Sequence, residues 1–509
     1  MKRKIDLVLG LAALSTAILL TAVASGDVPL GIPGEWVWPR IIEDLPVGGL
    51  LIAGAGVAVY GAFAAAGFRS LGAVEVSRRR EAAWLFGLVL GASAVQAVVP
   101  IGAPGRYGLE RWGVIHCYRV CTGYYDVVKE QVGPDPWAFL ADYPRWVRAQ
   151  GAGHLGVHPP GLIAGYCGLL ALTERHPAAA DLLNSAMPSS TADGFRQVEV
   201  GMGMTIPAAD RAAVYLATLI TLFACAGTVA PLYLLARESL PPQVAWASAI
   251  LWPLAPAANL FQPLSDVAYP FLSACALAAA AWAARLRSSS DVSTLGGGRP
   301  LASVLGWAFL AVVSGAVMGF GMMFTLALLP VGLSVALVVM TTRGLGLTRG
   351  LSVIVAIGAG FLGVVAACWL ATRSDPFATW AANLANNARF NEGMRGSYLT
   401  WLIYNPFETA IAAGLPAFIW AAIGLTAGRR LVPRAAWCTL AVLAIADLSG
   451  RNMGEVARLW ILFLPPLFLA AGVGLRRLNA GFQAVFVTVA LTGVQTLGLQ
   501  CMIQLVYPP

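Results

Sequence analysis

Charged side chains are scarce in this sequence, since Asp, Glu, Lys and Arg together make up 11% of its 509 residues. A soluble globular domain carries roughly 25% charged residues. The hydrophobic fraction of 58% therefore excludes an ordinary soluble domain and indicates a membrane protein. The apolar runs have the length of helices and lack the alternation typical of barrel strands. In lipid, only helices and closed barrels satisfy the hydrogen bonds of every backbone N–H and C=O group. Because the pattern argues against a barrel, we expect an all-α polytopic membrane protein.

Histidine and cysteine are also scarce, and their spacing offers no metal-binding pattern. The chain has 4 histidines and 8 cysteines, and no zinc-type spacing appears among them. The sequence therefore identifies no cofactor, and binding of a divalent metal remains an alternative. The net charge of +8 forms no patch typical of nucleic-acid binding. We attribute the excess of positive charge to membrane topology and to anionic membrane lipid, and expect no nucleic-acid partner.

Apolar stretches of about 20 residues mark candidate membrane crossings. The first of them follows a basic N-terminus, and we interpret it as a retained helix rather than a cleaved signal peptide. About 13 transmembrane helices are predicted, near residues 5–26, 47–68, 84–102, 211–236, 243–260, 267–285, 302–320, 324–341, 350–371, 408–427, 434–449, 457–474 and 480–504.

The arginines support this arrangement of crossings. The positive-inside rule assigns loops rich in Lys and Arg to the cytoplasm. The arginine clusters all fall on the side of the N-terminus, at residues 78–80, 285–299, 343–349, 429–434 and 476–477. We therefore expect a multi-pass protein of the bacterial plasma membrane whose N-terminus is cytoplasmic, with a flexible cytoplasmic linker at residues 285–300.

The long polar connections fall on the opposite side of the predicted membrane, and residues 103–210 form the largest of them. We predict three parts: N-terminal transmembrane helices over residues 1–102, an extracytoplasmic loop over residues 103–210, and a transmembrane bundle over residues 211–509. All four histidines lie in the large loop. Either chemistry on this face or simple exclusion of histidine from an apolar bundle accounts for that clustering.

Two helices are predicted within the large loop. Residues 135–150 are typical of an amphipathic helix on the membrane surface, and Asp135-Pro136 is a good helix start. A second helix is expected over residues 161–172, directly after Pro159 and Pro160. It is too short to span a bilayer, and a crossing there would move every later arginine cluster outside. We therefore expect this helix to turn back without crossing.

An ordered set of motifs on this topology resembles the GT-C glycosyltransferases, and within them the glycosyltransferase 39 type, which includes protein O-mannosyltransferases and aminoarabinose transferases. The similar stretches are YYDVVKE at 124–130, DPWAFLADYP at 135–144, HPPG at 158–161, YLLARESL at 233–240, QPLSDVAYPF at 262–271 and GEVARLWILFLPPL at 454–467. The resemblance covers residues 100–285 well and the rest in topology alone.

The resemblance implies a sugar donor linked to polyprenyl phosphate and an inverting transfer on the outer face. It also implies that an acidic residue in the first large loop is the base. This sequence departs from the family pattern in two places. The large loop follows the third predicted crossing, and Thr122-Gly123 stand where the family has an acidic pair before Tyr124-Tyr125.

Four acidic residues are candidates for the catalytic base. Such a transfer needs a carboxylate that takes a proton from the acceptor hydroxyl. Asp126 lies nearest the family position, while Glu110 and Glu35 are rivals in other outer segments, and for each of the three a solvated loop carboxylate is the favoured alternative. Asp266 is the stronger candidate, because an acid at a membrane boundary is costly unless it pairs or faces a cavity. Its alternative role is to cap the following helix.

Transfer from a lipid phosphate also needs positive charge near the departing phosphate. The candidates for substrate binding are Arg451, Arg458 and Arg389, with Glu455 between the first two. We expect Glu455 and Arg458 on a helix that starts near residue 453, with Arg458 bound to phosphate; the alternative is a simple Glu455–Arg458 ion pair.

Two of the four histidines of the large loop and a polar segment later in the chain complete the candidate site. His154 and His158 are candidates for orienting the base or the acceptor, and the alternative is that the HPPG turn is a structural corner. Asn383, Asn386 and Asn387, with Trp380 and Phe390, have the chemistry of a sugar-binding surface.

The preferred interpretation is a membrane glycosyltransferase of the GT-C class whose acceptor is a lipid, a glycan or a protein. A lipid or polysaccharide transporter, a surface-polysaccharide polymerase or ligase, and a non-catalytic scaffold are the alternatives. A transporter is expected to have inverted repeats and broken helices at the midplane.

Overall fold

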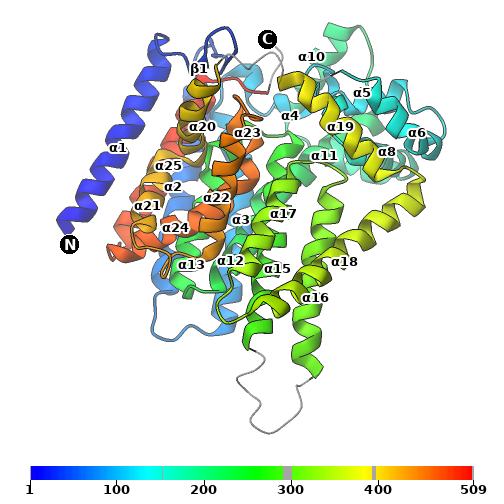
Figure 1. The fold of residues 1–509 in the computed structure, drawn as a ribbon. Helices are drawn as coiled ribbons and strands as arrows, with labels where there is room; N and C mark the ends of the chain where they lie inside the picture. Colours follow the sequence, from blue (N-terminus) through cyan, green and yellow to red (C-terminus); the bar gives the residue numbers. More distant parts are fainter. Residues whose placement is uncertain (1, 152, 290–300, 392–396, 507–509) are drawn as a thin grey trace.

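The computed structural model describes residues 2–151, 153–289, 301–391 and 397–506. Long helices stand side by side in a bundle, and a group of shorter helices covers one end of it (Figure 1). The strands found in the described residues are β1 (Gly31–Ile32) and β2 (Trp36–Val37), which pair in one antiparallel ribbon. The expected all-α class is therefore confirmed.

Seven described helical stretches are long and apolar enough to cross a membrane, and a bent pair of helices adds an eighth if it counts as one span. The seven are α1 (Lys2–Ser25), α2 (Val47–Ser70), α3 (Arg78–Val98) with η1 (Val99–Gly102), α11 (Ala208–Gly227) with α12 (Val229–Arg237), η4 (Ser265–Ala268) with α15 (Tyr269–Ser289), α18 (Leu347–Thr372) and α25 (Phe482–Met502). The chain is a multi-pass integral membrane protein. A total of about 13 crossings is not shown by these helices and stays a prediction.

The other predicted crossings form shorter or broken helices. They are α13 (Pro242–Ala249), η3 (Trp252–Leu254), α14 (Pro256–Leu260), α16 (Leu301–Gly321), α17 (Leu328–Met340), α20 (Tyr398–Ala413), α21 (Leu415–Leu425), α22 (Arg434–Leu448), α23 (Val456–Leu459), η6 (Ile461–Phe463) and α24 (Leu464–Arg477). Proline accounts for several of the breaks, because it lacks the N–H that continues a helix. The helices α20 and α21 meet at Gly414 with a bend of 110°.

The short helices of residues 103–210 gather at one end of the bundle, together with α19 (Pro376–Asn391) (Figure 1). We call this the loop end. Its helices are η2 (Gly105–Tyr107), α4 (Arg111–Cys117), α5 (Tyr124–Glu130), α6 (Pro136–Arg148), α7 (His154–Val157), α8 (Gly161–Arg175), α9 (Pro177–Ala186) and α10 (Ser189–Met202).

Both helices predicted for the large loop are present. The Asp135 carboxylate caps α6 by accepting hydrogen bonds from the backbone N–H groups of Trp137 and Ala138, at 3.0 and 3.2 Å. α8 begins directly after Pro159-Pro160 and continues to Arg175, three residues beyond the predicted end. It does not qualify as a membrane span, and it packs against α5 and α11.

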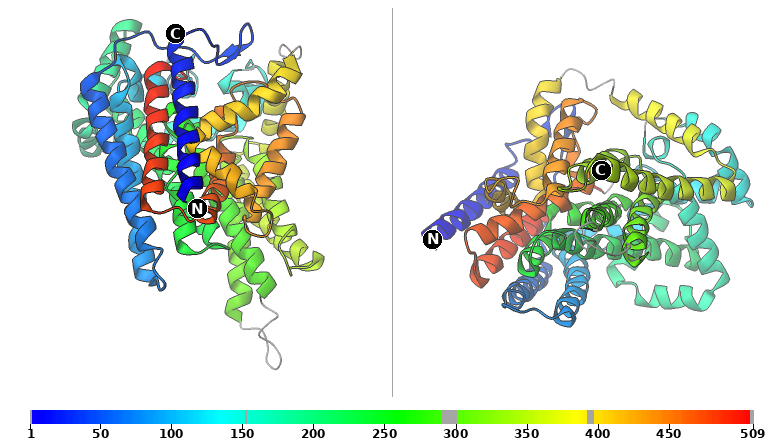
Figure 2. Two further views of the ribbon diagram at one scale, coloured as in Figure 1. Left: turned by 90° about the vertical axis from the view of Figure 1, so that its left-hand side faces the viewer. Right: turned by 60° about the horizontal axis from the view of Figure 1, so that its bottom comes forward.

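Ion pairs bring several arginine-containing connections together at the other end of the bundle. Arg237 contacts Glu81 at 2.6 Å, and Arg434 contacts Glu238 at 2.5 Å. We call this the arginine end. Figure 2 shows α1 and α25 side by side along the bundle. Most of the linker expected at residues 285–300 lies outside the described residues.

Cysteine labelling tests whether the two ends lie on opposite sides of the membrane. Asp181 in α9 and Arg79 in α3 are both exposed. In intact cells a membrane-impermeant maleimide should label the D181C variant, and the R79C variant only after permeabilisation. Labelling of the parent chain measures the background from the native cysteines. Labelling of both variants from the same side would contradict the arrangement.

Candidate active site

A cavity of about 260 Å³ at the loop end is lined by residues from distant parts of the chain. It brings together Asp266 and five of the six predicted substrate-binding residues. The lining residues are Trp36, Gly153, His154, Val157, His158, Asp266, Tyr269, Thr325, Ala327, Asn387, Arg451, Asn452, Met453, Gly454, Glu455, Arg458, Leu459 and Leu462. We call it the loop-end cavity.

Two asparagines of α19 hold the backbone turn that carries the histidines. The Asn383 amide donates to the carbonyls of Gly156 and His158, at 2.8 and 3.0 Å. The Asn386 amide donates to the carbonyls of Val147 and Gly156, at 2.9 and 3.0 Å. The carbonyls of Gly156 and His158 have no helical partner, because the prolines after His158 interrupt the helix, and these bonds satisfy them.

The predicted sugar-binding role of Asn383 and Asn386 is therefore wrong. Both side chains are buried, and their N–H groups already bond to backbone carbonyls. Trp380 is also buried and donates to the Met322 carbonyl at 3.1 Å. Asn387 alone of the three asparagines lines the loop-end cavity, and the Phe390 side chain lies outside the described part of the chain.

The two histidine rings stack at the edge of the cavity, with their centroids 6.3 Å apart. His158 Nδ1 lies 3.1 Å from the Phe324 carbonyl. A carbonyl only accepts hydrogen bonds, so Nδ1 carries the proton and Nε2 of the neutral ring is an acceptor. Burial lowers the pKa of His158 below its ordinary value, against the opposing effects of Asp266 and the Phe324 carbonyl.

His154 is neutral at physiological pH for a similar reason. Burial lowers its pKa to about 4, and the positive charge of Arg458 acts in the same direction. The histidine pair therefore offers hydrogen bonds without adding positive charge to the cavity. Among the described residues, no group of three or more His, Cys, Asp or Glu side chains is placed to hold a metal ion.

Arg458 is paired, and the geometry differs from the expected helix. α23 begins at Val456 rather than near residue 453, and Glu455 precedes it in a left-handed conformation with φ 53°. Arg458 donates to Glu455 Oε2 at 2.6 Å, while Trp36 Nε1 donates to Glu455 Oε1 at 3.1 Å. The ion pair considered from the sequence is therefore present, and a contact between Arg458 and phosphate stays a prediction.

Arg451 differs from Arg458 in both exposure and pairing. It is exposed at the rim of the cavity. Its guanidinium makes no hydrogen bond or ion pair with any residue that the structure describes. Arg389, by contrast, lies on the exposed side of α19, donates to Asn386 Oδ1 at 2.5 Å, and does not line the cavity. Arg451 is therefore the cation in this region with the most freedom to bind an anion.

Asp266 alone of the four predicted catalytic acids lines the cavity. It lies in η4, immediately before α15. Its carboxylate makes no hydrogen bond or ion pair within the described chain, so the alternative role as a helix cap is not observed. Its negative charge acts on both histidines and on Arg458. An unpaired carboxylate next to neutral imidazoles is chemically suited to accept a proton.

The other three predicted acids lie outside the cavity. Glu110 accepts a hydrogen bond from Gln197 at 2.9 Å, and Glu35 accepts one from Trp401 Nε1 at 2.6 Å. Asp126 is half-buried in α5. Burial raises the pKa of its carboxyl to about 6, Glu130 adds to this effect, and Arg119 opposes it. Asp266 is therefore the predicted acid that lines the same space as the histidines and Arg451.

Glu408 is a buried acid that the sequence interpretation passed over. It lies in α20, only 1% exposed, and it accepts a hydrogen bond from the Ala457 N–H at 3.0 Å, next to the ion pair of Glu455 and Arg458. Its signal in the sequence is a single carboxylate within a long apolar run, which is costly without a partner. Glu408 therefore fixes the first turn of α23 against α20.

A second cavity, of about 230 Å³ and mainly apolar, adjoins the first. Its lining includes Tyr124, Ser265 and Phe324. Tyr124 contacts the His158 ring, Ser265 precedes Asp266, and the Phe324 carbonyl contacts His158. The two cavities therefore share a wall. Ile220 also lines the second cavity and is 52% exposed, so this cavity borders the outer surface of the bundle.

A comparison with protein-family models finds no match to this chain, and a search of curated proteins finds no relative.

The raised pKa of Asp126 predicts a pH-dependent cost to stability. The folded carboxyl keeps its proton up to about pH 6, whereas the unfolded one loses it near pH 4. Stability is therefore lost as pH rises through this window. The uncharged variant Asp126→Asn should be more stable than the parent at pH 7.5, by about 1 kcal/mol after allowance for solvent screening.

Thermal unfolding in detergent at pH 7.5 and pH 4 measures this effect. The difference between Asp126→Asn and the parent should vanish at pH 4. Asp181→Asn on the exposed side of α9 is the control, with no change expected at either pH. Equal melting temperatures of Asp126→Asn and the parent at pH 7.5 would contradict the prediction.

Proposed function

We propose that this chain is an integral-membrane glycosyltransferase that moves a sugar from a polyprenyl-phosphate carrier to an acceptor hydroxyl. The observation that carries the proposal is the content of the loop-end cavity. An unpaired carboxylate, a neutral histidine pair and an unpaired arginine face one space from three segments of the chain. This is the set that lipid-phosphate sugar transfer requires: a base, donors and acceptors for hydroxyl groups, and a phosphate-binding cation.

In this proposal Asp266 is the base. It takes the proton from the acceptor hydroxyl as that oxygen attacks the anomeric carbon. The bond from the anomeric carbon to the phosphate oxygen breaks, and the phosphate leaves with the bonding electrons. A single displacement of this kind inverts the anomeric centre and needs no covalent intermediate. The acceptor is a lipid, a glycan or a protein.

Arg451 binds the phosphate of the carrier. A guanidinium offers two parallel N–H donors that match phosphate oxygens. The ion pair of Glu455 and Arg458 lies behind it and sets the shape of this wall. His154 and His158 hydrogen-bond to sugar or acceptor hydroxyls. The apolar second cavity takes the first isoprene units of the carrier, because its lining includes Ser265, the neighbour of Asp266, and reaches the surface of the bundle at Ile220.

The membrane orientation belongs to the same proposal. The arginine end lies in the cytoplasm, as the positive-inside rule requires. The loop end and its cavity then lie outside the cytoplasm, in or above the outer leaflet of a bacterial plasma membrane. About 13 crossings are compatible with this orientation if the broken helices count as spans.

Substitution of Asp266 tests the assignment of the base. Asp266→Asn keeps the size of the side chain and removes the basic oxygen. We expect kcat to fall at least about 100-fold, because a positioned general base contributes roughly 10² to 10⁴ in rate. The assay is transfer from a sugar-loaded polyprenyl phosphate by the purified full chain.

Glu110→Gln is the matched control, since Glu110 lies outside the cavity; its kcat should stay within about threefold of the parent. An active Asp266→Asn variant, or an inactive Glu110→Gln variant with an intact fold, would contradict the assignment.

Substitution of Arg451 tests phosphate binding. Arg451→Gln removes one charge-assisted contact, which contributes roughly 1.5 to 3 kcal/mol. We therefore expect kcat/KM for the donor to fall about 10- to 100-fold, with the melting temperature unchanged because the side chain is exposed. Arg389→Gln, on an exposed site outside the cavity, should change kcat/KM less than about threefold. Equal effects of the two variants would reject Arg451 as the phosphate ligand.

A lipid transporter is a second candidate, favoured by the broken helices. The 110° bend between α20 and α21 and the buried acid Glu408 are features expected of transporters. Reconstituted liposomes separate the two functions. Movement of labelled polyprenyl phosphate between leaflets without sugar transfer would favour the transporter over the glycosyltransferase.

A further inference from the structure

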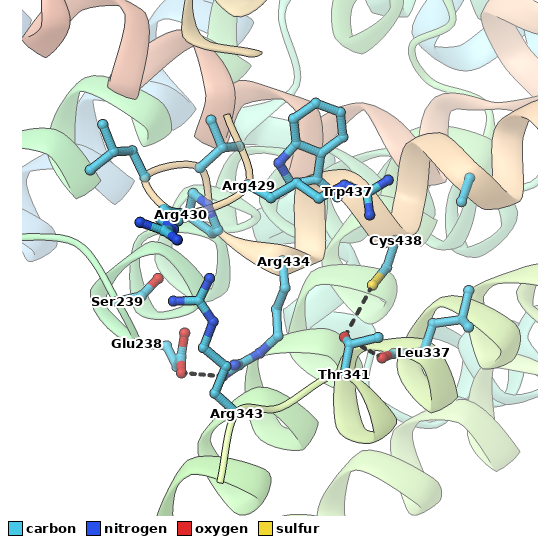
Figure 3. A pocket seen from close by; sticks show the side chains of 14 residues that line it. Glu238, Ser239, Leu337, Thr341, Arg343, Arg429, Arg430, Arg434, Trp437 and Cys438 are labelled. Carbon is cyan, nitrogen blue, oxygen red and sulfur yellow. Dashed lines mark hydrogen bonds and ion pairs between the residues drawn. The ribbon is translucent and has the colours of Figure 1, made fainter. Parts of the chain in front are cut away.

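A cavity of about 450 Å³ opens at the arginine end, far along the bundle from the loop-end cavity. Figure 3 shows it from close by, with the Arg434 side chain paired to Glu238. Its walls come from the connection after α12, from α17 and the loop that follows it, and from the α21–α22 loop and α22. It is separate from every residue that the proposed transfer reaction uses.

The cavity has an excess of positive charge. Four arginines line it, whereas Glu238 is the one acidic residue in the lining. Arg434 is paired with that carboxylate at 2.5 Å, and Arg429 lies over the Trp437 ring at 5.7 Å. Arg343 and Arg430 are exposed, and neither makes a hydrogen bond or ion pair with the described residues. Three positive charges are therefore uncompensated.

Two residues that line the cavity also carry hydrogen-bond donors without a partner. Arg434 Nε and Trp437 Nε1 are buried and have no hydrogen-bond partner among the described residues. Buried donors are normally satisfied in folded proteins. A ligand for this space must therefore carry negative charge and several acceptor oxygens. A phosphate group meets both requirements, and arginine is well matched to it.

The remaining walls are apolar and continue onto the outer surface of the bundle. Leu337, Val432 and Ala441 line the cavity beside the arginines. On the same helix as Leu337, the side chains of Leu333 and Met340 are each 41% exposed. Since α17 belongs to a membrane bundle, an apolar chain can leave the cavity along this helix. The ligand is then amphipathic, with a phosphate head and a hydrocarbon tail.

We propose that this cavity binds the phosphate head group of an anionic membrane phospholipid in the leaflet at the arginine end. Arg343 and Arg430 contact the phosphate oxygens, and the acyl chains lie against α17. Basic pockets between transmembrane helices are suited to such head groups. The site goes beyond the proposed transfer reaction, whose donor phosphate binds at the opposite end of the molecule.

Native mass spectrometry of the delipidated, detergent-solubilised full chain tests this site. The probes are phosphatidylglycerol, phosphatidylcholine and inorganic phosphate, each titrated separately at physiological salt. We expect one tightly bound phosphatidylglycerol, with phosphatidylcholine at least tenfold weaker. The double variant Arg343→Gln/Arg430→Gln should weaken the binding of phosphatidylglycerol at least tenfold. Both side chains are exposed, so the fold should be retained, which the melting temperature checks.

The control variant Arg79→Gln/Arg80→Gln removes the same charge from exposed positions outside the cavity. It should change phosphatidylglycerol binding less than about twofold, because exposed charges are screened at this salt concentration. Equal losses in both double variants would show non-specific attraction and overturn the site. Displacement of the lipid by millimolar inorganic phosphate would assign the cavity to a soluble phosphate compound instead, and would also overturn the proposal.

Discussion

Backbone groups that leave a helix inside a membrane protein need partners from the protein itself, because lipid offers none. This constraint explains the construction around the loop-end cavity. The backbone is irregular at the His154–His158 turn, where the amides of Asn383 and Asn386 take up the free carbonyls. It is irregular again before α23, where the Glu408 carboxylate accepts the Ala457 N–H. The cavity lies where these two satisfied breaks face each other.

The two ends of the bundle differ in how far carboxylates compensate their arginines. At the loop end, Glu455 compensates Arg458, while Asp266 and Arg451 remain without partners in the described chain. This leaves one unpaired carboxylate and one unpaired guanidinium facing the same space. At the arginine end, four guanidinium groups share a single carboxylate. The first arrangement suits a reaction that moves a proton and a phosphate, and the second suits the retention of an anion.

The parts of the structure that could be predicted from the sequence follow from local patterns. Long apolar runs predicted seven of the membrane-spanning helices. The pair Asp135-Pro136 predicted the start of α6, and Pro159-Pro160 predicted the start of α8. The arginine clusters, through the positive-inside rule, predicted that Asp266, the histidines and Arg451 lie at the same end of the bundle. In the structure these residues line one cavity. The burial of Asn383 and the positions of Asp126 and Glu110 outside the cavity depend on tertiary packing, for which a single sequence has no local signal.

Photocrosslinking of the carrier tests the central claim most directly. A polyprenyl phosphate with a diazirine on its first isoprene unit would be bound to the purified full chain, irradiated, and mapped by peptide mass spectrometry. The account predicts crosslinks in the segments that line the loop-end and second cavities, residues 154–169, 217–221, 262–270 and 451–462. Crosslinks confined to residues 337–343 and 429–441 at the arginine end, or to the surroundings of Glu110, would contradict it.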